Sequence, residues 1–173
     1  MPDPRLVRKQ EDIEKLRQLQ KQMSTVLEIL LVEGNPPNRV ELKIKLPTAV
    51  DKNYPQNVSN VSTISIQLPS NYPIQEPAVT FRSSIWNPNV YPSGKLCIGK
   101  WTITENLELL VKRIIQVIVL DPAIINVGSP ANGEAAQWYS SAHRKNPALF
   151  PTLRVENLFK SEQKRTITWR SIK

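Results

Sequence analysis

The spacing of apolar residues changes along this chain, and those changes limit the folds open to it. In residues 5–23 apolar side chains recur every three or four positions among Lys, Arg, Glu and Gln, which predicts an amphipathic helix. At residues 40–46 apolar and charged side chains alternate strictly, and the same two-residue period returns at 62–68. That period predicts strands with one buried face. Dense apolar runs at 26–32 and 78–81 predict two more strands.

Two further helices are predicted in the second half of the chain. Residues 107–119 carry apolar side chains at helical spacings over a wide face, as expected for a helix buried in a core. Pro122 is expected to end this helix, and Thr102 with Glu105 three residues later to form its capping box. Residues 131–144 predict the last helix.

The predicted elements define an α+β fold. Four sequential strands joined by short connections form an antiparallel meander, and the helices pack on one of its faces. Between the last strand and the buried helix lies a long irregular segment, residues 82–101, which contains prolines and glycines. Long ordered loops often carry function, so the candidate site is expected there.

Positive charge is concentrated at the C-terminal end. The chain has 23 Lys and Arg against 15 Asp and Glu, a net charge of +8, and residues 144–173 carry +6 of it. We therefore predict a domain at 1–151 and a basic extension at 152–173. A basic segment can bind an acidic protein, a membrane surface or nucleic acid. No base-reading motif accompanies it, so we expect no specific nucleic-acid binding.

The residue inventory argues against several kinds of chemistry. There is one cysteine, Cys97, and one histidine, His143, so no internal disulfide forms and no zinc ligand set is evident. No glycine-rich nucleotide motif occurs, and no metal or cofactor is expected. No apolar run approaches the roughly 18 residues of a membrane span, and the N-terminus does not resemble a signal peptide. We expect a cytoplasmic protein.

Three separate motifs resemble those of the ubiquitin-conjugating enzyme family. LPSNYPIQEPAVTF at 68–81 is similar to the family's YPxxPPxVxF stretch. IWNPNVYPSGKLCI at 85–98 is similar to its His-Pro-Asn motif and the cysteine run that follows. SPANGEAA at 129–136 is similar to its [Asp/Ser]-Pro-Ala-Asn-x-Glu-Ala-Ala sequence. The resemblance covers about residues 5–150, and the order of predicted elements agrees with the family fold.

The resemblance implies an activity centred on Cys97. In the family the catalytic cysteine lies eight residues after the Asn of His-Pro-Asn, and Asn89 and Cys97 are eight residues apart. The family implies that Cys97 accepts a ubiquitin-like protein as a thioester from an activating enzyme. The modifier then passes to a lysine amine of a target, in some cases with a ligase.

The chemistry of thioester exchange agrees with this implication. A thiol is intrinsically nucleophilic, so its exchange with a thioester needs no adjacent general base. A papain-like hydrolase needs a histidine, and His143 lies inside a predicted helix. We therefore favour a thioester carrier over a cysteine protease. Because a modifier's extended C-terminal tail must reach the thiol, Cys97 is expected to be at least partly exposed in a shallow groove.

Two further residues are assigned to the site by the resemblance. Asn89 is expected to stabilise the oxyanion during amine attack or to hold the loop, and the alternative is an ordinary turn residue after Pro88. Ser129 is expected to gate or desolvate the incoming amine, and the alternative is the N-cap of the helix that follows.

The chain departs from the family pattern near the cysteine. Asn87 stands where the family has a structural histidine, so we expect it to replace that residue in part. Pro88, Tyr91 and Trp101 are expected to support the loop with it. Trp101 follows Cys97 sooner than in typical members, which shortens the loop. These departures suggest a divergent branch, either from a bacterial conjugation system or from distant eukaryotic members.

The first helix is expected to bind the activating enzyme. Its basic side chains Arg8, Lys9 and Lys15 are predicted on the exposed face, where they would set the association rate; a merely solvated face is the alternative. A second class of function is also open, a catalytically weak or inactive module of the same fold that binds ubiquitin-like proteins. Such modules usually lack the cysteine, which this chain keeps.

Overall fold

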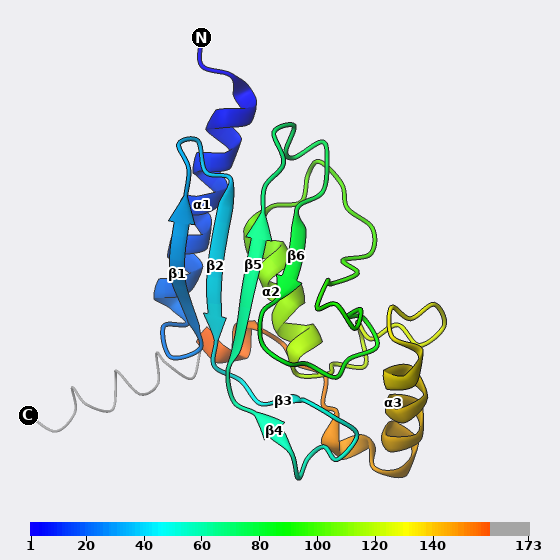
Figure 1. The fold of residues 1–173 in the computed structure, drawn as a ribbon. Coiled ribbons are helices and arrows are strands. Elements are labelled where there is room, and N and C mark those ends of the chain that lie inside the picture. Colours follow the sequence, from blue (N-terminus) through cyan, green and yellow to red (C-terminus); the bar gives the residue numbers. More distant parts are fainter. Residues whose placement is uncertain (160–173) are drawn as a thin grey trace, which may run out of the picture.

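A computed structural model describes residues 1–159 of the chain, and it confirms the predicted α+β fold. Its main sheet contains four antiparallel strands in the order β1-β2-β5-β6, a meander interrupted once (Figure 1). The N-terminal helix and these strands are α1 (Pro4–Gln22), β1 (Leu27–Glu33), β2 (Arg39–Ile44), β5 (Ser62–Gln67) and β6 (Ala78–Phe81). Each lies within two residues of its predicted range.

The interruption lies where the sequence predicts only a loop. Residues 47–60 contain a separate two-stranded sheet, β3 (Thr48–Ala49) with β4 (Val58–Ser59). Two residues per strand are too few to show a period, which is why the pattern gave no signal. The Thr48 hydroxyl donates to the Ile118 carbonyl over 2.7 Å and ties this small sheet to the core.

The two later helices are confirmed, but other residues cap them. Helix α2 (Leu107–Ile118) begins at Asn106, whose side chain accepts from the Leu109 N–H. Thr102 and Glu105 do form a bond, Thr102 N–H to the Glu105 carboxylate at 3.0 Å, one turn before the helix. Helix α3 (Gly133–Lys145) is capped by Asn132, so the N-cap alternative for Ser129 is wrong.

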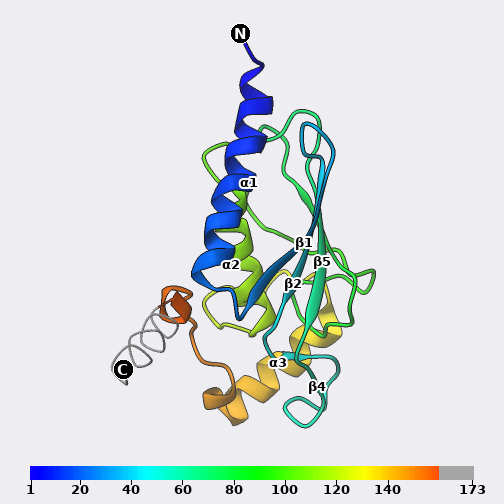
Figure 2. The same cartoon turned by 90° about the vertical axis from the view of Figure 1, so that its left-hand side faces the viewer.

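Helices α1 and α2 cover one face of the main sheet and leave the other face open. Figure 2 views the sheet nearly edge-on, with both helices on the same side. Helix α2 lies beside α1 on this face, behind β5 and β6 in Figure 1, and its wide apolar face is fully inside the core. Every second residue of β2, Val40, Leu42 and Ile44, points into this core, as the alternation predicted.

Helix α3 stands apart on a second, aromatic cluster. Tyr139 and Phe150 are its buried centre, with ring centroids 5.0 Å apart. Tyr54, from the β3–β4 connection, stacks on Phe150 at 5.8 Å. The 3-10 helix η1 (Pro147–Leu149) closes the cluster below α3. The cluster fixes α3 beside the segment that carries Cys97 (Figure 1).

The predicted C-terminal extension begins with residues that pack on the domain. Val155 is buried, and Leu153, Leu158 and Phe159 pack against the main core. The Lys112 ammonium lies 5.7 Å from the centroid of the Phe159 ring. The basic residues Lys160, Lys164, Arg165, Arg170 and Lys173 lie outside the described residues. The domain boundary at residue 151 stays a prediction.

Within residues 1–159 no helix is both long enough and apolar enough to cross a membrane. The longest, α1, has 19 residues and is dominated by charged and amide side chains.

Candidate active site

The segment that carries Cys97 continues from the edge of the main sheet. Phe81 N–H donates to the Gly94 carbonyl at 2.8 Å, and Leu96 N–H donates to the Val79 carbonyl at 2.9 Å, so the segment follows β6. Side chains of an extended segment alternate in direction. Leu96 and Ile98 are buried, and Cys97 between them is therefore exposed.

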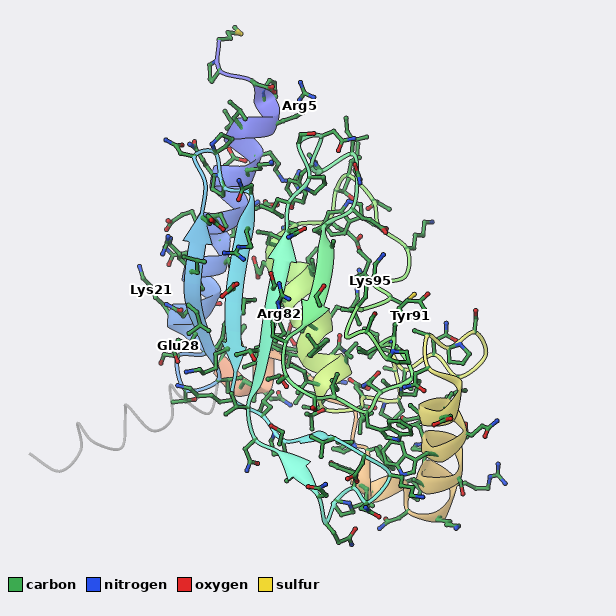
Figure 3. The ribbon with its side chains drawn as sticks, viewed as in Figure 1. Arg5, Lys21, Glu28, Arg82, Tyr91 and Lys95 are labelled. Atoms are coloured by element: carbon green, nitrogen blue, oxygen red, sulfur yellow. The ribbon has the colours of Figure 1, made fainter. Side chains whose placement is uncertain are left out.

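Cys97 lies in a half-open groove of about 520 Å³, which confirms its predicted exposure. Asn89 and Ser129 line the same groove, so the structure brings the three predicted catalytic residues together. Tyr91 and Lys95, labelled in Figure 3, mark the strand-like approach to the cysteine beside β6.

A glycine turn fixes the start of this approach. Gly94 N–H donates to the Tyr91 carbonyl and Tyr91 N–H donates to the Lys95 carbonyl, which closes a tight turn. Gly94 has φ +90°, and a Cβ there would lie 2.5 Å from the Phe81 carbonyl oxygen. Only glycine can therefore hold the segment this close to β6.

Asn87 links helix α2 to the active-site loop. It is fully buried; its amide donates to the Val117 carbonyl at 2.7 Å, and its oxygen accepts from the Asn89 N–H at 2.9 Å. One side chain thus joins the end of α2 to the active-site loop.

Asn89 bonds to the cysteine segment through its backbone and to residues 124–126 through its side chain. Its carbonyl accepts the Cys97 N–H at 2.8 Å, which sets the position of the nucleophile. Its amide group donates to the Ile124 carbonyl at 3.0 Å and accepts from the Asn126 N–H at 2.8 Å. A side-chain amide has a second N–H besides the one that is bonded to the Ile124 carbonyl.

Ser129 is placed by Asn126, a residue that the sequence analysis did not identify. The Asn126 side-chain oxygen accepts from the Gly128 N–H at 3.1 Å and the Ser129 N–H at 3.0 Å. The Pro88 carbonyl accepts from Ala131 and Asn132 and so attaches the start of α3 to the loop. An Asn two residues before a Gly is a turn signal that could have indicated Asn126.

Two predicted loop supports lie elsewhere. Tyr91 is 44% exposed at the turn, and its side chain is not part of the loop's interior. Trp101 packs beside Tyr72, with ring centroids 5.9 Å apart, and its indole N–H donates to the Pro73 carbonyl at 2.9 Å. The loop around Asn89 is instead held by amide side chains, because these can satisfy buried backbone groups directly.

The segment after Cys97 is held by two arginines. Arg113, on α2, donates to the Ile98 carbonyl at 2.8 Å and forms an ion pair with Glu105. Arg8, on α1, donates to the carbonyls of Ile103 and Glu105. The sequence analysis missed Arg113, because its partners meet only once the loop has folded.

The first helix differs from the predicted basic face. Lys9 is only 4% exposed, and this burial lowers the pKa of Lys9. Lys9 precedes Ile13 by four residues and Leu16 by seven, so it lies on the apolar side of α1. Arg8 is partly buried against the buried carboxylate of Asp12. Lys15 is exposed, as predicted.

The remaining candidates for metal or base chemistry lie away from the groove. Among residues 1–159 no group of three or more His, Cys, Asp or Glu could hold a metal ion. His143 stacks on Tyr139 in the aromatic cluster, with ring centroids 5.6 Å apart. The polar lining of the groove consists of a thiol, two amides, two hydroxyls, Lys100 and an arginine-glutamate pair.

The chain belongs to the ubiquitin-conjugating enzyme family, because the family model matches residues 8–149. It is similar to "Ubiquitin-conjugating enzyme E2" of African swine fever virus, with 32% identity over 99 residues, 50% of this chain and 44% of the viral protein. It is similar to "Ubiquitin-conjugating enzyme E2 14" of Arabidopsis thaliana, with 36% identity over 91 residues, 42% of this chain and 52% of the plant protein.

The chain therefore spans about half the length of the curated relatives it matches. The fold is also shared with a solved ubiquitin conjugating enzyme structure from Plasmodium yoelii, at 19% identity and a TM-score of 0.57. That match covers 89% of this chain and 99% of the other.

Proposed function

We propose that the chain is a conjugating enzyme that carries ubiquitin or a ubiquitin-like modifier as a thioester on Cys97. The Cys97 thiolate attacks the thioester carbonyl of the modifier on an activating enzyme, and the activating enzyme's thiol leaves. A lysine amine of the target then attacks the new thioester, and the Cys97 thiol leaves. The observation that carries this proposal is the exposed Cys97 beside Asn89 and Ser129 in one open groove.

Asn89 and Ser129 act on the second step in this proposal. The unused N–H of the Asn89 amide stabilises the oxyanion that forms as the amine attacks. The Ser129 hydroxyl, on the other border of the groove, orients the amine or its water. The placement of both residues along the groove supports these roles.

A charging assay tests the proposal. Full-length chain is mixed with an activating enzyme, ATP and modifier, and a reductant-sensitive adduct is expected. Cys97→Ser is expected to give a reductant-resistant oxyester, and Cys97→Ala no adduct. His143→Ala is the matched control and is expected to charge like the parent. No adduct with any modifier tested, or a thiol-labile adduct on Cys97→Ser, would contradict the proposal.

We propose that the exposed face of α1 contacts the activating enzyme. Lys9 is buried and Arg8 is bound to the loop, so only Lys15 of the three predicted residues is exposed. Arg17 and Lys21 are also exposed on this helix, and Figure 3 labels Lys21. Reversing Lys15, Arg17 and Lys21 to Glu should slow charging, more at low salt than at high salt. Discharge of pre-charged enzyme to free lysine should not change, and equal charging rates would contradict the contact.

The remaining partners are a target protein and, in some reactions, a ligase, and we place the reaction in the cytoplasm. A binding module without catalysis is the second candidate, and the retained Cys97 weighs against it. The two separate in the charging assay combined with a binding titration. Modifier binding without any adduct would favour the module.

A further inference from the structure

The segment that follows Cys97 is short, yet it is held at both ends by charged side chains. Only three residues separate Cys97 from Trp101, and two arginines hold the segment that begins there. Arg113 reaches up from α2 to its beginning, and Arg8 reaches across from α1 to its end. The two contacts differ in their distance from the nucleophile.

Arg113 contacts the residue immediately after the nucleophile. Its Nη1 donates to the Ile98 carbonyl at 2.8 Å, and its Nη2 is paired with the Glu105 carboxylate. The other Glu105 oxygen accepts from the Thr102 N–H at 3.0 Å. Arg113 therefore fixes the start of the loop directly and its middle through Glu105.

Arg113 also faces the groove. Its side chain is 23% exposed, and Arg113 and Glu105 are among the groove-lining residues beside Cys97. A planar guanidinium can donate to two acceptors in fixed directions at once, whereas an ammonium is a single compact donor centre. The geometry uses this property, since one nitrogen bonds the carbonyl and the other bonds the carboxylate.

We propose that Arg113 is a positioning residue for Cys97, an inference that rests on the proposed function. The Asn89 carbonyl fixes the Leu96–Cys97 peptide, and Arg113 fixes the Ile98–Gly99 peptide, one residue beyond Cys97. With both peptides held, the thiol keeps one direction toward the groove. Without the Arg113 bond the Ile98 carbonyl turns freely, and the thiol meets the modifier's thioester in fewer productive orientations.

The Arg113–Glu105 ion pair can be tested separately from the hydrogen bond between Arg113 and Ile98. Glu105→Gln removes the charge on the pair but leaves Arg113 able to donate to Ile98. If Arg113 acts only by stabilising the fold through the ion pair, Glu105→Gln and Arg113→Met will be equally impaired. If it positions Cys97, Arg113→Met will be impaired much more.

The chain offers a matched control on the same helix. Lys112, the neighbour of Arg113, forms an ion pair with Glu108 at 2.8 Å, and its side chain is exposed to a similar degree. Lys112→Met removes an α2 ion pair of comparable exposure, and the contact with the Phe159 ring, without touching the cysteine loop. It reports the cost of losing such a pair in general.

The experiment measures charging kinetics, unfolding and one NMR signal on the parent and four variants of the full chain. Arg113→Met is expected to lower kcat for charging by at least tenfold, with KM for the activating enzyme within twofold. Glu105→Gln and Lys112→Met are expected to stay within threefold of the parent, and Arg113→Lys to recover part of the rate. Urea unfolding verifies that each variant is folded under the assay conditions.

The NMR signal separates failure of this inference from failure of the proposed function. The carbonyl carbon of Ile98 is expected to shift in Arg113→Met and to stay unchanged in Lys112→Met, whether or not the chain can be charged. A parent that is never charged contradicts the proposed function. A charged parent whose Arg113→Met variant keeps its kcat, or loses no more than Glu105→Gln, overturns the positioning role.

Discussion

The two sides of Cys97 are held by different chemistry. The segment before it depends on the neutral amides of Asn87 and Asn89, which are almost completely buried and bond to backbone groups. The segment after it depends on the guanidinium groups of Arg113 and Arg8, which are partly exposed and bond to carbonyls and to Glu105. One side is a rigid neutral support, and the other is an ionic support at the surface.

This difference indicates which properties each side should have. Buried neutral hydrogen bonds are insensitive to salt, and losing one partner leaves the other group unsatisfied in the core. A partly exposed ion pair is weakened by salt, and its long side chains can readjust. The segment before Cys97 is therefore expected to determine the stability and geometry of the site. The segment after Cys97 is expected to change its conformation more easily.

The largest expected effect comes from removing the central amide of the first side. Asn87→Ala leaves the buried Asn89 N–H without its partner, at about 1–3 kcal/mol, and removes one of the two donors to the Val117 carbonyl, which keeps the Leu120 N–H. We expect the free energy of unfolding in urea to fall by about 3 kcal/mol. Asn57→Ala, which removes a surface bond to Asp51, is the control and should cost less than about 0.5 kcal/mol.

Asn87→His is expected to keep most of that stability, because an imidazole can also donate to the Val117 carbonyl. A loss below about 1 kcal/mol in Asn87→Ala would show that the neutral side is not the stronger support.

The next effect concerns the chemistry of the second reaction step. Asn89→Ala removes the proposed oxyanion donor, and a loss of one such donor typically lowers the rate about 100-fold. Discharge of pre-charged enzyme to free lysine should slow by that order, while charging of Cys97 changes little. Pre-steady-state discharge assays measure the two steps separately. If Asn89→Ala discharges as fast as the parent, Asn89 is a loop-holding residue only.

Sequence patterns predicted the parts of the fold that have a period. Apolar spacing gave α1, α2, β2 and β5, because burial of one face requires that spacing, and dense apolar runs gave β1 and β6. It missed β3 and β4, which are too short to have a period. It placed the cap of α2 at Thr102, whereas Asn106, four residues later, caps the helix.

The residues of the candidate site were also predicted only in part. Cys97, Asn89 and Ser129 were identified because the family motif places them, and Asn87 because it breaks that motif. Arg113 was not identified, because its partners Ile98 and Glu105 come together through the path of an irregular loop. The burial of Lys9 could have been predicted, because its helical spacing to Ile13 and Leu16 places it on the apolar side of α1.

Salt should separate the two sides of the cysteine. The Thr102 N–H bonds to the Glu105 carboxylate, and the Cys97 N–H bonds to the Asn89 carbonyl. Raising NaCl from about 0.05 to about 1 M shortens the Debye length from more than 10 Å to about 3 Å. We expect hydrogen exchange at Thr102 to accelerate several-fold and exchange at Cys97 to stay constant. Equal responses would remove the distinction between a neutral and an ionic support.

A smaller effect is expected at the opposite border of the groove. Ser129→Ala removes a neutral hydroxyl whose backbone remains fixed by Asn126, so discharge to free lysine should slow about two- to threefold. Ser129→Asp should accelerate the same step, because a carboxylate also attracts the lysine ammonium. A decrease of 100-fold in Ser129→Ala would instead make Ser129 a main determinant of the reaction.

The smallest effect tests the cation next to Arg8. Burial lowers the pKa of Lys9 below its ordinary value of 10.5, so the charged form is destabilised in the folded protein. Lys9→Met should raise Tm by roughly 2 °C at pH 7, equivalent to about 1 kcal/mol. Below pH 10.5 the unfolded chain holds the proton more tightly, so the parent gains stability as pH rises toward 10.

The Tm advantage of Lys9→Met should therefore shrink at pH 10. Calorimetry at the two pH values measures this difference, and Lys15→Met is the exposed control. A constant or growing difference would mean that burial does not dominate at Lys9.

Two glycines, one before Cys97 and one after it, differ in which substitutions the backbone allows. Any side chain at Gly94 would collide with the Phe81 carbonyl, whereas Gly99, at φ +74°, has open space around it. In a saturating library selected for charging, position 94 should accept glycine alone. Position 99 should also admit Asn or Asp, which tolerate this backbone conformation. Insertions and deletions should accumulate after the cysteine rather than before it, so related chains can vary in length there without losing the approach to the thiol.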